Sequence, residues 1–69
     1  MDIKMLAAKV ADEIGDAMEY AKMAMNVKET DLDLSRMLRD ISSQEMEHMN
    51  ELHKALADRV KELQDMYSK

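Results

Sequence analysis

Glu45 and His48 are the two residues whose types and spacing point most directly to chemistry. They form a Glu-x-x-His motif within a long run of helix-forming residues, and side chains three positions apart share a face of a helix. A carboxylate and an imidazole on one face can bind the same metal ion. The pair also continues a stripe of apolar residues with alternating steps of four and three, formed by Leu34, Leu38, Ile41, Leu52 and Ala55. Because a buried charge is costly unless it is paired or metal-bound, this position favours a metal site.

The composition limits the kind of protein that the chain can be. Its 69 residues predict one domain, residues 1–69, whose core is so small that it needs a partner. The sequence has no cysteine and therefore no disulfide or thiolate metal site. The net charge of −5, without basic clusters, argues against binding of nucleic acid or anionic membranes. No apolar run approaches ~18 residues and no signal peptide is evident, so we expect a cytoplasmic protein without a membrane span.

The elements that position these residues are two predicted helices, at about residues 2–26 and 31–67. The first carries its own stripe with steps of three and four, and Glu13 is its one charged member. The stripe consists of Ile3, Leu6, Val10, Glu13, Ala17, Tyr20, Ala24 and Val27. Between the helices, we expect Asn26 to end the first helix in the left-handed conformation and Thr30 to cap the second. A single bent helix is the alternative.

An antiparallel hairpin of these helices brings the ionisable residues together. With the turn centred near residue 29, the numbers of facing residues add up to about 58, which places Glu13 level with Glu45. The charged residue of the first stripe therefore faces the Glu-x-x-His motif of the second. The second helix also extends past the first, so residues 57–69 need cover from another chain.

A hairpin leaves a long apolar groove, which a second copy can close as a four-helix bundle with two-fold symmetry. Such a homodimer would hold two copies each of Glu13, Glu45 and His48. Each of two ions would then have one His48 ligand, one terminal Glu13 ligand and two bridging Glu45 carboxylates. This ligand set suits iron, or alternatively manganese, better than zinc.

The sequence resembles the rubrerythrins of the ferritin-like superfamily over about residues 10–56. Glu13, with Tyr20 seven positions later and Ala24 one turn further, is similar to their first iron-binding helix. The segment Ser43-Gln-Glu-Met-Glu-His48 is similar to their second. The resemblance implies half of a ferritin-like domain, with Glu13, Glu45 and His48 as ligands of a dinuclear iron centre. It also implies that oxygen or peroxide oxidises ferrous iron at this centre. Because this chain has neither a rubredoxin-type cysteine centre nor a second helix pair, the electron donor stays unknown and the site must form between chains, as in half-size encapsulin-associated ferritins.

Two other functions stay open at the level of the sequence. The hairpin could be a metal-free helical dimerisation module, or it could store metal without catalysis. Tyr20 likewise has two interpretations, as a packing residue or as a hydrogen-bond donor that orients a bridging carboxylate.

Overall fold

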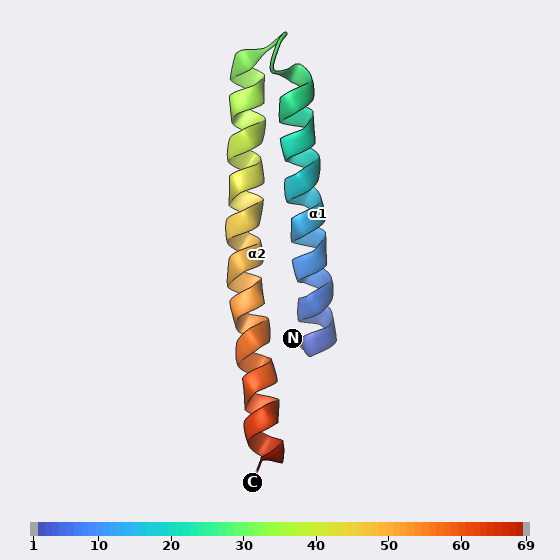
Figure 1. Ribbon diagram of the computed structural model, residues 1–69, viewed down its shortest axis with the longest axis vertical. Helices are drawn as coiled ribbons and strands as arrows, with labels where there is room; N and C mark the ends of the chain where they lie inside the picture. The colour runs from blue at the N-terminus through green and yellow to red at the C-terminus, as the bar shows by residue number, and fades with distance from the viewer. Residues whose placement is uncertain (1, 69) are drawn as a thin grey trace.

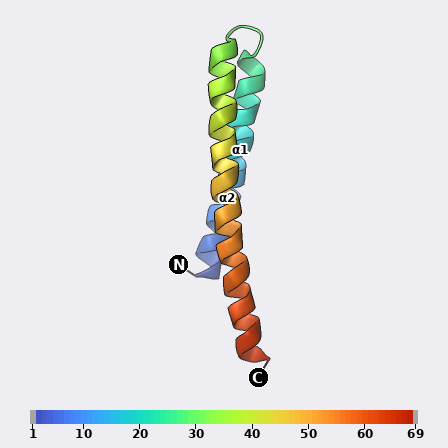
Figure 2. The same cartoon turned by 90° about the vertical axis from the view of Figure 1, so that its left-hand side faces the viewer.

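A computed structural model describes residues 2–68 and shows two antiparallel helices joined by a short turn (Figure 1). Helix α1 spans Ile3–Val27 and helix α2 spans Leu32–Tyr67, each beginning one residue later than expected from the sequence. The pair is 60 Å long, and the helices cross at a shallow angle (Figure 2). The prediction of packed antiparallel helices is confirmed, whereas assembly into a four-helix bundle stays a prediction.

The turn differs in detail from the sequence-based expectation. Asp31, rather than Thr30, is the N-cap of α2, and its carboxylate accepts a hydrogen bond from the backbone N–H of Leu34 at 3.0 Å. The Thr30 hydroxyl instead donates to the carbonyl of Val27 at 3.3 Å, at the end of α1. A left-handed Asn26 is also wrong, since no described non-glycine residue has a positive φ. An acidic cap is favourable here because it also interacts with the positive end of the helix dipole.

Small residues allow α1 and α2 to approach each other closely. Ala17 and Ala24 of α1 are buried, and the carbonyl of each accepts a hydrogen bond from a serine of α2. The hydroxyl of Ser35 donates to Ala24 at 2.8 Å, and that of Ser42 donates to Ala17 at 2.7 Å. Each bond contributes about 1 kcal/mol. Leu6 and Leu38 are the buried large side chains of this interface.

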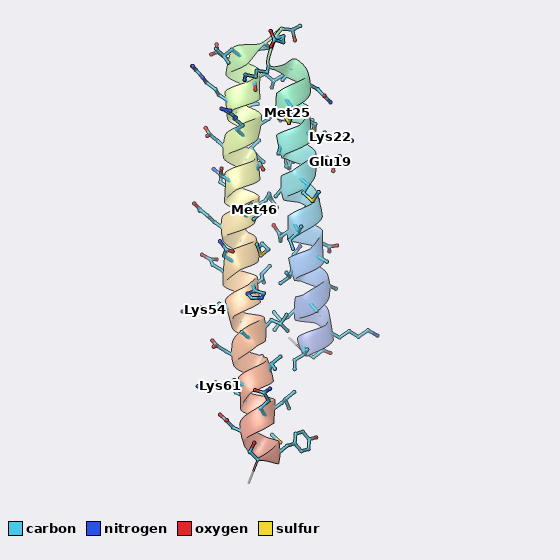
Figure 3. The ribbon with its side chains drawn as sticks, in the orientation of Figure 1. Glu19, Lys22, Met25, Met46, Lys54 and Lys61 are labelled. Atoms are coloured by element: carbon cyan, nitrogen blue, oxygen red, sulfur yellow. The ribbon has the colours of Figure 1, made fainter. Side chains whose placement is uncertain are left out.

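The buried face of α2 is rotated relative to the predicted stripe. Leu34, His48 and Ala55 of the predicted stripe are exposed in the single hairpin and do not pack against α1. The positions that face α1 are Ser35, Leu38, Ser42, Glu45, Met49, Leu52 and Leu56, with the predicted Ile41 half-buried at their edge. The two serines explain the rotation, because their bonds to α1 require them to lie at the interface. Lys54 and Lys61 project from the opposite side of α2 (Figure 3).

The hairpin leaves much apolar surface in contact with solvent. On α1, Met18 and Met25 keep 67% and 76% of their surface exposed. On α2, Leu32, Leu34 and Met37 keep 49%, 36% and 53% of their surface exposed. Neither described helix is long and apolar enough to cross a lipid bilayer. Surface of this kind is typical of an interface with another chain.

Candidate metal centre

Glu13, Glu45 and His48 come together midway along the hairpin. Each offers a donor atom, and the three atoms lie within 4.8 Å of one another. Glu13 comes from α1, whereas Glu45 and His48 lie on adjacent turns of α2. The hairpin therefore assembles one nitrogen and two oxygen donors from positions far apart in the sequence.

Glu13 is buried although it carries a carboxylate. Only 7% of its surface is exposed, and its Oε2 atom has no hydrogen-bond partner among the described residues. Two cationic or potentially cationic groups lie nearby: Lys9 Nζ is 3.6 Å from Glu13 Oε1, and His48 Nδ1 is 3.8 Å from Glu13 Oε2. A buried carboxylate oxygen without a hydrogen bond is costly, and a bound cation would remove that cost.

The two carboxyl groups have pKa values shifted in opposite directions. The pKa of Glu13 is lowered from its ordinary 4.5, mainly by a hydrogen bond shared with Glu45 and further by the nearby Lys9 ammonium, although burial opposes this shift. The pKa of Glu45 is raised, mainly by the same hydrogen bond and also by burial and the negative charge of Glu13. The two shifts favour the charged form of Glu13 and the neutral form of Glu45. A metal ion that binds both carboxylates would require the charged form of Glu45 as well.

The donor set fits a divalent transition metal. Imidazole and carboxylate are ligands for iron, manganese and zinc, and three protein donors leave further coordination positions open. The burial of the donors is graded: Glu13 is buried, Glu45 is half-buried, and the His48 side chain is 59% exposed. The cluster thus opens to solvent on the His48 side, where an ion can enter and where another chain can approach.

Tyr20 is not part of this cluster. It is half-buried on α1, and no hydrogen bond of its hydroxyl is found within residues 2–68. Its hydrogen bond to a bridging carboxylate stays a prediction. Lys9, in contrast, was missed by the sequence reasoning, although its position four residues before Glu13 is a known spacing for an ion pair on a helix.

No family model, curated protein or solved structure matches this chain. The resemblance to rubrerythrins therefore rests on the residues around Glu13, Glu45 and His48 alone, together with the spacing that brings them to one level of the hairpin.

Proposed function

We propose that the protein is a ferritin-like, dinuclear iron-binding protein whose site forms between two copies of the hairpin. Glu13 would be a terminal ligand, Glu45 a bridging ligand and His48 the nitrogen ligand of each ion. Two ions per dimer are expected, with manganese as the alternative to iron. When bound, the ions would supply redox chemistry for oxidation of ferrous iron with oxygen or peroxide.

The buried Oε2 atom of Glu13 is the observation that carries this proposal. This atom lies 3.8 Å from Nδ1 of His48 and has no hydrogen-bond partner among the described residues. A carboxylate without a function could lie on the solvated surface of the hairpin at no such cost. A structural role would require a partner for this atom, whereas a metal ligand needs a free lone pair. The half-buried Glu45 completes the set, and an ion bound to it would favour the charged form that its raised pKa disfavours.

The stoichiometry of bound iron tests the proposal. The protein is loaded anaerobically with ferrous iron, freed of excess metal and measured by mass spectrometry beside a Glu45→Ala/His48→Ala variant. We expect close to one iron per chain in the parent and none in the variant. Equal iron in both proteins would refute the ligand assignment, and no iron in the parent would refute the metal site. Oxygen consumption by the loaded parent then separates catalysis from storage.

One observation favours a second candidate, a metal-free dimerisation module. Lys9 and His48 both lie within 4.0 Å of the Glu13 carboxylate, so protein groups can offset part of its charge without a metal. In that case, replacement of Glu45 and His48 by leucine should stabilise the dimer, because a well-packed apolar pair commonly replaces a buried ionic one at no cost. The measurement is dimer dissociation in the presence of a chelator, and a weaker dimer would count against this function.

A further inference from the structure

A small hollow lies near the turn, beside the hydrogen bond that the Ser35 hydroxyl donates to the carbonyl of Ala24 at 2.8 Å. The hollow has a volume of about 310 Å³. It is lined by Ala21, Ala24, Met25 and Lys28 of α1 and by Ser35 and Arg39 of α2. The lining therefore combines small and apolar side chains with two cations, and none of its six side chains is acidic.

The two cations lie at opposite ends of this hollow. Lys28 follows Ala24 by four residues on α1, and Arg39 follows Ser35 by four residues on α2. Because the helices are antiparallel, Lys28 is about one turn of helix closer to the hairpin turn and Arg39 is about one turn further from it. Side chains on a helix lean toward its N-terminus, so each cation leans back over the hollow. A ligand that lies between them can therefore contact both.

Arg39 has no acidic partner on its own helix. Neither Arg39 nor Lys28 forms an ion pair with another described residue. The helix dipole favours a cation at the end of α1, which accounts for Lys28 but not for Arg39. The positions three and four residues from Arg39 hold no carboxylate and are Ser35, Arg36, Ser42 and Ser43. Arg36, in contrast, has Asp33 and Asp40 at these spacings. In a chain with a net charge of −5, an unpaired arginine beside a hollow indicates an anionic ligand.

We propose that this hollow, the anion pocket, binds a small amphipathic carboxylate. The guanidinium of Arg39 has the planar fork that binds a carboxylate through two parallel hydrogen bonds, and the ammonium of Lys28 adds a second positive charge. The hydrocarbon part of the ligand packs on Ala24 and Met25. The hydroxyl hydrogen of Ser35 is already used in its bond to Ala24, so it is not free to bind a hydroxyl-rich ligand such as a sugar.

The apolar part of the lining distinguishes this ligand from an inorganic anion. Met25 lies near the turn end of α1 (Figure 3), and 76% of its surface is exposed. A hydrocarbon chain that covers Met25 and Ala21 removes apolar surface from water, which favours binding, whereas an inorganic anion leaves that surface exposed. The volume of about 310 Å³ is near the lower end of the range for ligand pockets, so a short chain fits better than a long one.

The anion pocket is separate from the candidate metal centre. Arg39 and His48 are about two and a half turns apart, so they lie on opposite sides of α2. Ala24 lies about 16 Å from Glu13 along α1. The second copy in the proposed function approaches from the side of His48 and leaves the anion pocket open. The inference therefore does not depend on the proposed function and can be tested on the metal-free protein.

The first test is an NMR titration of the metal-free protein, in chelator, with hexanoate. We expect the largest shifts at the methyl groups of Ala21, Ala24 and Met25. Hexanol and acetate should each bind about tenfold more weakly, because hexanol lacks the charge and acetate lacks the hydrocarbon chain. Shifts that are absent, or that are spread over the whole chain, would overturn the proposal. Hexanol as tight as hexanoate would refute the role of the cations, and acetate as tight as hexanoate would refute the apolar contact.

The second test compares two matched variants in the same titration. Arg39→Gln should weaken the binding of hexanoate about tenfold, because it removes charge-assisted hydrogen bonds. Arg36→Gln is the control, because it removes the same charge from the same helix at a position that does not line the pocket. Circular dichroism should show an intact hairpin in both variants, since both arginines are exposed. Unchanged binding by Arg39→Gln, or an equal loss in both variants, would overturn the proposal.

Sedimentation without hexanoate separates a small ligand from another occupant, an acidic side chain of a second copy. If such a side chain filled the pocket, Arg39→Gln would associate less than the parent, and Arg36→Gln would not. We expect the parent and both variants to have the same oligomeric state at every concentration. A change in Arg39→Gln alone would overturn the assignment of a small ligand in favour of a contact between copies.

Discussion

Addition of a divalent metal ion to the metal-free protein should raise its melting temperature strongly. The donors of Glu13, Glu45 and His48 lie within 4.8 Å only because α1 packs on α2. In the unfolded chain, Glu13 is separated from the other two by the whole turn, so the ion binds the folded state almost exclusively. A ligand of this kind stabilises the fold by RT ln(1 + [L]/Kd).

The size of the effect follows from the length of the chain. Mn²⁺ at about 100 times its dissociation constant adds about 2.7 kcal/mol. A chain of 69 residues has an unfolding entropy of roughly 0.145 kcal/mol/K, so each kcal/mol raises the melting temperature by about 7 °C. The expected shift is therefore about 19 °C. Mn²⁺ is the suitable ion because, unlike ferrous iron, it is stable in air during the experiment.

The assay is thermal melting followed by circular dichroism, with chelator or with Mn²⁺, on the parent and on Glu13→Leu. In chelator, the variant should melt a few degrees higher than the parent, because leucine removes the carboxylate oxygen that has no hydrogen bond. With Mn²⁺, the parent should shift and the variant should not. An unshifted parent, or an equal shift in the variant, would refute the assignment of Glu13 as a ligand.

Three further predictions concern Gly15, Lys9 and the carboxyl pair of Glu13 and Glu45. Gly15→Ala should raise the free energy of unfolding by about 0.5–1 kcal/mol in a denaturant melt, because an added Cβ meets nothing within 4 Å and alanine favours the helix. Lys9→Met should tighten Mn²⁺ binding several-fold in a calorimetric titration, whereas Lys9→Arg should not, because the charge next to Glu13 repels the ion. The carboxyl pair should stabilise the metal-free fold most near pH 4.5. As the pH rises and passes the raised pKa of Glu45, the stability that this carboxyl group contributes is lost. As the pH falls and passes the lowered pKa of Glu13, the stability that the Glu13 carboxylate contributes is lost. Melts of the parent and of a Glu13→Gln/Glu45→Gln variant over about pH 3–7 check this sign.

The position of the candidate site along the hairpin could be predicted from the sequence because only the rise per residue of a helix and the position of the turn determine it. The rise of a helix is constant, and the only break in the helical pattern fixed the turn, so Glu13 and Glu45 had to lie opposite each other. The face of α1 was equally clear, since each position of its stripe is buried or half-buried in the structure. Helix periodicity and the position of one turn were sufficient for both.

The rotation of α2 could not be predicted from apolar periodicity. Leu34 is more apolar than Ser35, yet Leu34 is exposed and Ser35 is buried against α1, so the apolar pattern favoured the wrong residue of this pair. The serines lie inside because each donates a hydrogen bond to an α1 carbonyl beside a buried alanine, which a hydrophobicity pattern does not represent. Such bonds depend on how closely two helix backbones approach, and this distance is a property of the folded pair.

The two stripes on α2 overlap, and the overlap suggests why Glu45 is suited to the bridging role. The inner stripe consists of the positions that face α1, such as Ser35 and Ser42. The outer stripe is the one predicted from the sequence, and its members Leu34 and His48 are exposed in the single hairpin. Glu45 belongs to both. A carboxylate at the shared position faces Glu13 of its own chain and also borders the surface that a second copy would cover. A residue of the inner stripe alone could not reach a second chain, and one of the outer stripe alone could not reach Glu13. His48 belongs only to the outer stripe and is exposed in the single hairpin, and the proposed second copy would cover it.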